Sequence, residues 1–171
     1  MEKEKLIIRK LQENDIQSIV DIQITGWQTA YKGIIDDAVL NSMNKKKRTE
    51  RIKRHYKETD FIVAEADGDV VGFCNYIDST EYTPDISDID CELLALYVKP
   101  DLKYNGIGTR LFHFVINDFK RKHKSKMILW CLKDNIPSIR FYSKMGGEII
   151  KNRTINIGNH SYCEVGIGYK L

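Results

Sequence analysis

The chain has 171 residues, 42% of them hydrophobic and 30% charged, with a formal net charge of +3. These values suit one globular domain with a sizeable core, and the charge is too small to indicate a nucleic-acid partner. No segment approaches the roughly 20 apolar residues of a membrane span, and the charged start lacks a signal-peptide core. We therefore expect a single domain over residues 1–171 that binds neither nucleic acid nor membrane.

Helix and strand signals alternate along the chain with no linker between them. A short strand at residues 6–8 precedes a helix capped by Asn14 or Asp15. Turns at residues 67–69 and 158–159 each predict a hairpin. Strands joined by β-α-β connections indicate an α/β or α+β fold with a mixed sheet. Further helices are expected at 36–43, 45–57, from the glycine loop to 119, and at 136–145, and further strands at 61–66, 70–77, 93–98, 127–132, 148–157 and 161–169.

The cysteines and histidines are scattered. Each cysteine lies in an apolar, strand-like segment, which favours buried free thiols over a disulfide or a metal site and, with them, the cytoplasm. The histidines lack ligand spacing, so we expect no metal. These residues are Cys74, Cys91, Cys131, Cys163, His55, His113, His123 and His160.

A glycine-containing loop, Asn-Gly-Ile-Gly at residues 105–108, joins a buried strand to an amphipathic helix. Unpaired N–H groups and the helix dipole attract an anion there, and the glycines let the main chain approach a phosphate closely. The loop therefore predicts a ligand with a phosphate or pyrophosphate. A Rossmann pattern fails because Leu111 replaces the third glycine, and a P-loop fails because Thr109 and Arg110 follow Gly108. A glycine helix entry without a ligand stays open from this loop alone.

A second segment, at residues 129–148, carries an asparagine after a strand and a Phe-Tyr pair on the next helix. Together the two segments resemble the GCN5-related N-acetyltransferase (GNAT) superfamily. The first matches Gln/Arg-x-x-Gly-x-Gly/Ala, with Lys103 in the first place, where it keeps a charge but loses the fork of arginine. The second matches Asn-x-x-Ala-x-x-Phe-Tyr-x-Lys-x-Gly through Asn135, Ser138, Phe141, Tyr142, Lys144 and Gly146.

The resemblance implies a GNAT fold, a mixed sheet of about seven strands flanked by about four helices, with two parallel central strands that splay apart. It implies acetyl-CoA as co-substrate, with pantetheine added like a strand against the backbone of Leu96 and Val98. Amides of residues 104–109 would hold the pyrophosphate, and Asn135 the pantetheine arm. The cofactor-binding residues implied in this way are Leu96, Tyr97, Val98, Lys103, Tyr104, Asn105, Gly106, Ile107, Gly108, Thr109, Asn135, Ser138 and Tyr142.

Acetyl transfer to an amine of pKa about 10 calls for a base near neutral pH. Glu92 is the candidate, at the place of the glutamate base of the histone-acetyltransferase branch, and alternation puts it on one strand face with Leu94, Leu96 and Val98. A solvent-exposed carboxylate at the strand edge is the alternative. Tyr142 is the candidate acid for the leaving thiolate, with a core tyrosine as its alternative, and the N–H of Val98 would meet the oxyanion.

The acceptor is expected to be a small cationic amine, either a polyamine or amino-acid-like, or a peptide N-terminus, which attacks directly in a ternary complex. Trp27 and Tyr31 lie one helical turn apart and form either an aromatic wall of the acceptor site or part of the core. The acidic loop at residues 85–92 favours a cationic acceptor and offers Asp85, Asp88 and Asp90 as proton relays.

Two other functions stay open. A catalytically weak GNAT fold would only bind acetyl-CoA or dock a partner. The basic run at residues 45–57 would bind nucleic acid or a membrane surface, although a solvated helix face is more typical of such a run. A homodimer is compatible with the resemblance to the superfamily.

Overall fold

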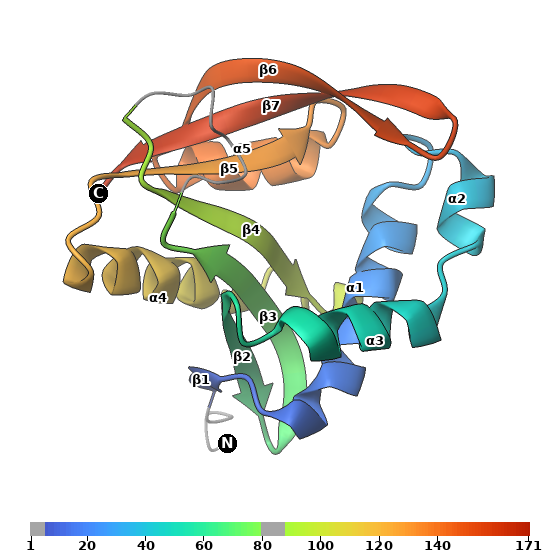
Figure 1. The fold of residues 1–171 in the computed structure, drawn as a ribbon, viewed down its shortest axis with the longest axis horizontal. Coiled ribbons are helices and arrows are strands. Elements are labelled where there is room, and N and C mark those ends of the chain that lie inside the picture. The colour runs from blue at the N-terminus through green and yellow to red at the C-terminus, as the bar shows by residue number, and fades with distance from the viewer. Residues whose placement is uncertain (1–5, 80–87) are drawn as a thin grey trace.

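The computed structural model describes residues 6–79 and 88–171, and the predicted helices and strands are all present there (Figure 1). The described residues form five α-helices rather than about four, because the brief second helix is among them. In chain order the elements are β1 (Ile7–Lys10), a 3-10 turn (Glu13–Asp15), α1 (Ile16–Ala30), α2 (Asp37–Asn41), α3 (Lys45–His55), β2 (Asp60–Ala66), β3 (Asp69–Ile77), β4 (Cys91–Val98), a second 3-10 turn (Pro100–Leu102), α4 (Ile107–Arg121), β5 (Lys126–Leu132), α5 (Ile136–Lys144), β6 (Glu148–Ile157) and β7 (His160–Lys170).

The strands form one mixed sheet in the order β1-β2-β3-β4-β5-β7-β6. β4 and β5 are its parallel pair, joined by a crossover through α4, and they pair only over Cys91–Leu93 against Met127–Leu129. Beyond Leu93 the two strands separate, while β4 stays paired with β3 up to Val98. The predicted splay of the two central strands is therefore confirmed.

A β-bulge interrupts β4 where it splays from β5. Ala95 pairs with Asn75 and Leu93 pairs with Tyr76, so Leu94 is an extra residue without a partner on β3. A bulge of one residue reverses the alternation of side chains beyond it. The prediction that Glu92 shares a face with Leu94, Leu96 and Val98 is therefore wrong, because it assumed regular alternation.

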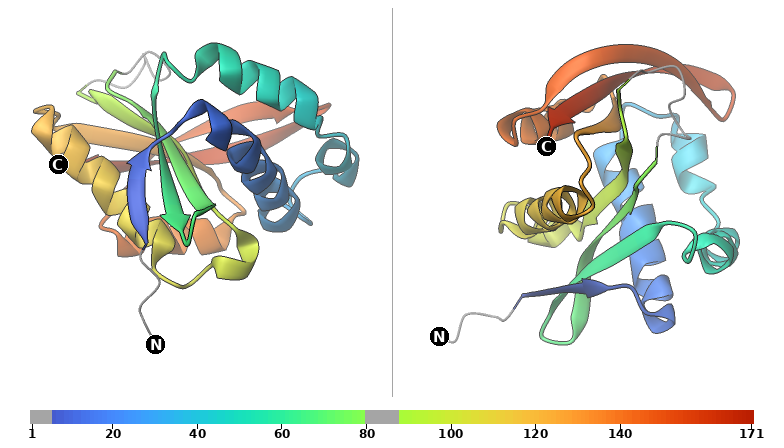
Figure 2. Two further views of the ribbon diagram at one scale, coloured as in Figure 1. Left: turned by 90° about the horizontal axis from the view of Figure 1, so that it is seen from below. Right: turned by 60° about the vertical axis from the view of Figure 1, so that its left-hand side comes forward.

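The burial of the β4 side chains agrees with this reversal. Leu93, Leu96 and Val98 contact the apolar cluster under α4, whereas Ala95 and Tyr97 contact the cluster under α1. Glu92, one residue before Leu93, lies on the face of Ala95 and Tyr97. That side of the sheet, which carries α1, α2 and α3, is called the α1 face below, and the opposite side, with α4 and α5, is called the α4 face (Figure 2).

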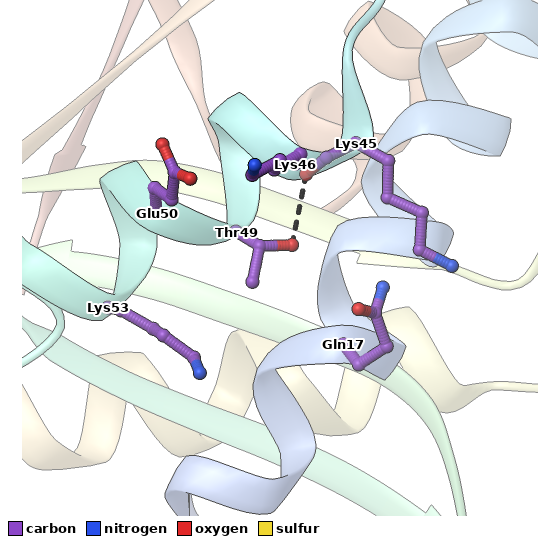
Figure 3. Close-up of a pocket in the computed structure, with 6 residues that line it drawn as sticks. All are labelled: Gln17, Lys45, Lys46, Thr49, Glu50 and Lys53. Carbon is purple, nitrogen blue, oxygen red and sulfur yellow. Dashed lines mark hydrogen bonds between the residues drawn. The ribbon is translucent and has the colours of Figure 1, made fainter.

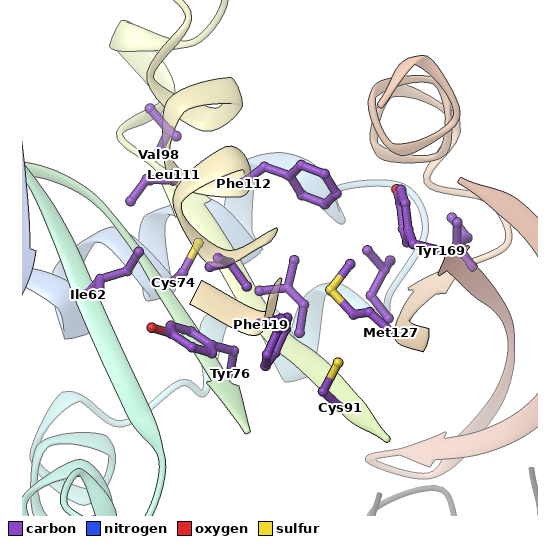
Figure 4. Packing of buried hydrophobic residues seen from close by; sticks show 14 of the residues in the cluster. Ile62, Cys74, Tyr76, Cys91, Val98, Leu111, Phe112, Phe119, Met127 and Tyr169 are labelled. Carbon is purple, nitrogen blue, oxygen red and sulfur yellow. The ribbon is translucent and has the colours of Figure 1, made fainter. Parts of the chain in front are cut away.

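The larger core lies on the α4 face (Figure 4). α4 buries Leu111, Phe112, Val115 and Phe119, which recur at helical spacing, against the sheet. Each fully buried side chain of this size contributes about 1.5–3 kcal/mol to stability, so this packing fixes the start of α4 against the end of β4.

All four cysteines are free, but the prediction of burial holds only for Cys74, Cys91 and Cys131. Cys163 is exposed because the pairing of β7 with β5 ends at Glu164, and Cys163 lies just past it on the hairpin. No helix among residues 6–79 and 88–171 is long and apolar enough to cross a membrane.

Candidate active site

The wedge between β4 and β5 leaves main-chain groups of β4 unpaired. The N–H of Lys99 donates to the carbonyl of Val71, which makes the two residues a hydrogen-bonded pair of the β3–β4 ladder. Because such pairs alternate in an antiparallel ladder, the main chain of Leu96 and of Val98 points away from β3, into the wedge. Within the described residues, nothing on β5 pairs with it there. This is an edge to which an extended ligand adds as a strand.

Tyr97, expected with Leu96 and Val98 among the cofactor-binding residues, is placed differently. By the same alternation its main chain pairs with β3, and its side chain lies on the α1 face. There its hydroxyl accepts a hydrogen bond from Nε1 of Trp27 at 2.8 Å, and its ring stacks on Phe73. Tyr97 therefore belongs to the packing between α1 and β4.

The predicted anion site lies at the mouth of the wedge. Gly106 caps α4 in the left-handed region, with φ of 79°, and no side chain caps the helix. The first helical bond is donated by Arg110, so the N–H groups of residues 107–109 have no acceptor in the described part of the chain. Unpaired amides and the helix dipole together suit a phosphate group.

The residues around these amides differ in exposure. Lys103 and Asn105 are exposed, and Tyr104 is 97% exposed with a φ of 68°. Gly108 faces the wedge, since a Cβ there would lie 3.6 Å from Phe141 and 3.7 Å from Leu96. The loop thus presents main-chain donors at the wedge and polar side chains to solvent.

Asn135 lies on the β5 side of the wedge and is 5% exposed. Its Oδ1 accepts a hydrogen bond from the N–H of Ser138 at 3.4 Å and so caps α5. Its side-chain nitrogen has no hydrogen-bond partner among the described residues and remains available to a ligand. Ser138 itself takes part through this main-chain bond.

Tyr142 is half-buried on α5, with its ring centroid 6.3 Å from that of Phe112 and 5.2 Å from that of Phe141. The hydroxyl of Tyr169 donates to the main-chain oxygen of Tyr142 at 2.8 Å and holds this part of the helix on the sheet. Burial raises the pKa of Tyr142 well above its usual value, so its hydroxyl is a hydrogen-bond donor at neutral pH. It makes no hydrogen bond to another described residue.

Glu92 is 4% exposed, and its Oε2 has no hydrogen-bond partner among residues 6–79 and 88–171. The expected alternative, a carboxylate in solvent at the strand edge, is therefore wrong, because Glu92 is buried and β4 lies inside the sheet between β3 and β5. Burial raises the pKa of Glu92 to about 7, while the charge of Arg153 lowers it and that of Glu164 raises it. A carboxylate that titrates near 7 suits a proton acceptor at physiological pH.

Of the acidic loop before β4, Asp85 lies outside the described residues. Asp90 accepts hydrogen bonds from the N–H groups of Ser125 and Lys126 and from the Ser125 hydroxyl. Asp88 lies 3.5 Å from the ammonium of Lys126. These two carboxylates thus join the start of β4 to that of β5.

Trp27 and Tyr31 pack in part into the core, as one of the two alternatives expected. Their rings meet edge to face at 5.0 Å, and they pack against the cluster of Ile35, Leu40 and Leu132 on the α1 face. Both remain partly exposed. Gly26 brings α1 close to β4, since a Cβ there would lie 2.8 Å from the Tyr97 ring.

Three further residues of the α1 face were not found from the sequence. Arg153 on β6 has its guanidinium carbon 3.8 Å from the ring centroid of Trp130 on β5, and its Nε is 2.8 Å from Glu164 on β7. The sequence offers one signal for them: in each of the three strands, the alternation of side chains assigns the residue to one of the two faces of the sheet.

An open groove between α1 and α3 lies apart from the wedge (Figure 3). The basic run forms α3, none of whose residues is fully buried, and Ile52 packs partly against the α1-side cluster. This confirms a solvated helix face. The residues lining the groove are Gln17, Lys45, Lys46, Thr49, Glu50 and Lys53.

Comparison with known proteins agrees with this architecture. Residues 25–147 match the model of the acetyltransferase (GNAT) family. The chain is 26% identical to an uncharacterized N-acetyltransferase, YuaI, of Bacillus subtilis over 95% of this chain and 91% of that protein. It is 27% identical to a spermidine N(1)-acetyltransferase of Thermoplasma acidophilum over 83% and 88% of the two chains.

Among solved structures, the PaiA N-acetyltransferase of Thermoplasma acidophilum in complex with coenzyme A superposes with a TM-score of 0.75. It is 24% identical and covers 98% of this chain and 99% of that one, which shows a common fold. The family model spans most of the chain, including the wedge and both motifs. The chain therefore belongs to the GNAT family of N-acetyltransferases.

Proposed function

We propose that this acetyltransferase binds acetyl-CoA in the wedge between β4 and β5 and transfers its acetyl group directly to a primary amine that lies on the α1 face. The observation that carries the proposal is the unpaired main chain of Leu96 and Val98, which leads to the uncapped start of α4. In this arrangement the amides of residues 107–109 hold the pyrophosphate, and the side-chain nitrogen of Asn135 donates to the pantetheine arm.

Glu92 accepts the proton of the attacking amine. A carboxylate of pKa about 7 is mostly ionised just above neutral pH, and its unpaired Oε2 is free to accept a hydrogen bond. As the amine nitrogen bonds to the acetyl carbon, the N–H of Val98 stabilises the oxyanion. The C–S bond then breaks, and the hydroxyl of Tyr142 donates a hydrogen bond to the thiolate.

For the acceptor we propose a small cationic amine, polyamine or amino-acid-like, or a peptide N-terminus. The partly exposed Trp27–Tyr31 pair and the carboxylate of Glu92 support an amine on this face. The similarity to a spermidine N(1)-acetyltransferase supports the same class. We also propose a cytoplasmic location, which the free cysteines support.

The test is thiol release from acetyl-CoA with a panel of polyamines, amino acids, aminoglycosides and peptides with free N-termini. Saturable release with at least one amine is the expected result, with a rate that depends on both substrates in the manner of a ternary complex. If the protein binds acetyl-CoA and no amine releases thiol, the proposal is wrong, and the fold serves as a binding module.

A further inference from the structure

Four side chains from four strands meet on the α1 face of the sheet. Glu92 comes from β4, Trp130 from β5, Glu164 from β7 and Arg153 from β6. Their neighbours in sequence on β5 and β7 are in the core of the α4 face, which places Trp130 and Glu164 on the opposite side. The charges of Arg153 and Glu164 both act on Glu92, and Trp130 joins this group through its contact with Arg153.

Arg153 is held in a fixed orientation within this group. Its Nε donates to Oε2 of Glu164 at 2.8 Å, and its guanidinium lies over the Trp130 ring at 3.8 Å. The two terminal nitrogens have no hydrogen-bond partner among the described residues, and 36% of the side chain is exposed. A planar guanidinium that is anchored at one end and free at the other is suited to bind a carboxylate with two hydrogen bonds.

Two buried polar atoms of the same group lack hydrogen-bond partners in the part of the chain that the structure describes. Oε2 of Glu92 is an unpaired acceptor, and Nε1 of Trp130 is an unpaired donor. Glu92 is more than nine-tenths buried. Buried polar groups are nearly always hydrogen-bonded, so a pair such as this points to a ligand that brings both a donor and an acceptor.

We propose that the acceptor amine carries a carboxylate in the same molecule, and that Arg153 binds this carboxylate while the amine lies at Glu92. The inference rests on the proposed acetyl transfer and narrows its acceptor to amino-acid-like compounds. A polyamine has only donors and positive charges, which leaves the Arg153 fork unpaired and sets like charges near each other. An amino acid supplies the donor for Glu92 and the oxygens for Arg153.

The proposal is tested with pairs of acceptors that differ only in the carboxylate. Lysine and cadaverine form one pair, and ornithine and putrescine form the other. A site that binds a carboxylate rejects the analogue without it, so kcat/KM should be at least about 100-fold higher for the amino acid of each pair. Equal values within a pair, or a preference for the diamine, would overturn the inference.

Variants of Arg153 separate recognition from structural support. Arg153→Gln should remove most of the discrimination within each pair, chiefly through KM of the amino acid, and Arg153→Lys should restore only part of it because lysine lacks the fork. Arg54→Gln makes the same charge change on the exposed side of α3 and should leave the ratio unchanged. If Arg153→Gln lowers activity equally for both members of a pair, Arg153 has only a structural role.

A binding measurement separates this inference from the proposed transfer. Trp130 is one of two tryptophans, so the part of a fluorescence change that disappears in Trp130→Phe reports on the Arg153 stack. With coenzyme A present, lysine or ornithine should change the fluorescence saturably, and cadaverine or putrescine should not. This result without any thiol release would reject the transfer but keep the carboxylate site. Equal responses, or none, would reject the carboxylate site.

Discussion

At the scale of the residue, Glu92 combines two opposed effects. Its carboxylate is buried, with no hydrogen-bond partner among the described residues, and this burial favours the neutral form and raises its pKa from 4.5 to about 7. The same environment that suits proton transfer therefore weakens the fold. A carboxylate that only stabilises the sheet would not be expected to carry this cost in stability.

Activity should follow the ionisation of Glu92. Because the base acts only when it has lost its proton, kcat/KM should rise with pH and level off above an inflection near pH 7. Glu92→Gln should lower kcat/KM by about 10²–10⁴ at neutral pH while acetyl-CoA still binds. The pH profile of thiol release checks this, and a Glu92→Gln enzyme of normal rate would exclude the role.

Stability should respond in the opposite direction. The folded-state pKa lies above the unfolded value, so the folded state holds more protons between pH 4.5 and 7, and stability falls as pH rises through that window. The full effect, up to about 3 kcal/mol, is present above pH 7. Glu92→Gln removes it and should raise the unfolding temperature at pH 8 by several degrees and at pH 5 by much less. Thermal unfolding at the two pH values measures the difference, and a lower unfolding temperature at pH 8 would contradict it.

Tyr142 offers a simpler substitution, because its hydroxyl makes no hydrogen bond within the described residues. Tyr142→Phe should keep the contacts with Phe112 and Phe141, and with them the stability. It should lower kcat about 10²-fold, since the leaving thiolate loses its donor, and leave acetyl-CoA affinity nearly unchanged. Steady-state kinetics and calorimetric titration test the two parts, and an unchanged kcat would assign Tyr142 to packing alone.

At the scale of the element, the close approach of α1 to β4 depends on Gly26. An alanine gains up to about 1 kcal/mol of helix propensity but places a Cβ 2.8 Å from a Tyr97 ring carbon. Overpacking of this kind costs about 1–3 kcal/mol, so Gly26→Ala should lower the unfolding temperature and weaken acceptor binding as Tyr97 and Trp27 shift. Thr29→Ala, on the exposed side of the same helix, is the control and should do neither.

The start of α4 gives a test of the cofactor site. A Cβ at Gly108 fits, but a larger side chain would extend toward Phe141, Leu96 and Val98 and into the wedge. Gly108→Val should therefore lower acetyl-CoA affinity by at least about tenfold, or about 1.4 kcal/mol. In Gly106→Ala the added Cβ would meet no other atom of the described residues, so this substitution would act only through the strain of an alanine at a left-handed φ. Calorimetry of both variants tests the placement, and an unchanged affinity of Gly108→Val would count against it.

Local signals predicted the elements well and their fine geometry poorly. Helical spacing and turn residues are properties of neighbouring residues, so α1, α4 and both hairpins could be predicted. The bulge at Leu94 arises from the pairing of β4 with β3, and no residue near Leu94 predicts it. The contact of Arg153 with Trp130 depends on the order of the strands in the sheet, where β7 lies between β5 and β6. Hydrophobic periodicity does not predict this strand order.

At the scale of the whole molecule, the two halves of the sheet are joined by the short parallel pairing of β4 with β5. The strands β1 to β4 form one half and β5, β7 and β6 the other, and three residue pairs connect them. A ligand that bonds to β4 and to α5 adds to this connection. At 100 times its Kd, acetyl-CoA should stabilise the fold by about 2.7 kcal/mol, and the amides of Leu96 and Val98 should gain protection from hydrogen exchange. A thermal shift without protection at β4 would place the ligand elsewhere.

The splay also divides the contacts by chemical kind. On the proposed cofactor side the contacts are made largely by main-chain groups, which every amino acid supplies, whereas the proposed acceptor site on the α1 face consists of side chains. Substitutions at Arg153, Trp130 or Trp27 should therefore change which amine is accepted without disturbing the acetyl donor. An enzyme arranged in this way is free to change its acceptor during evolution, and laboratory selection for new acceptors should concentrate its mutations on α1, β5 and β6 and leave the wedge intact.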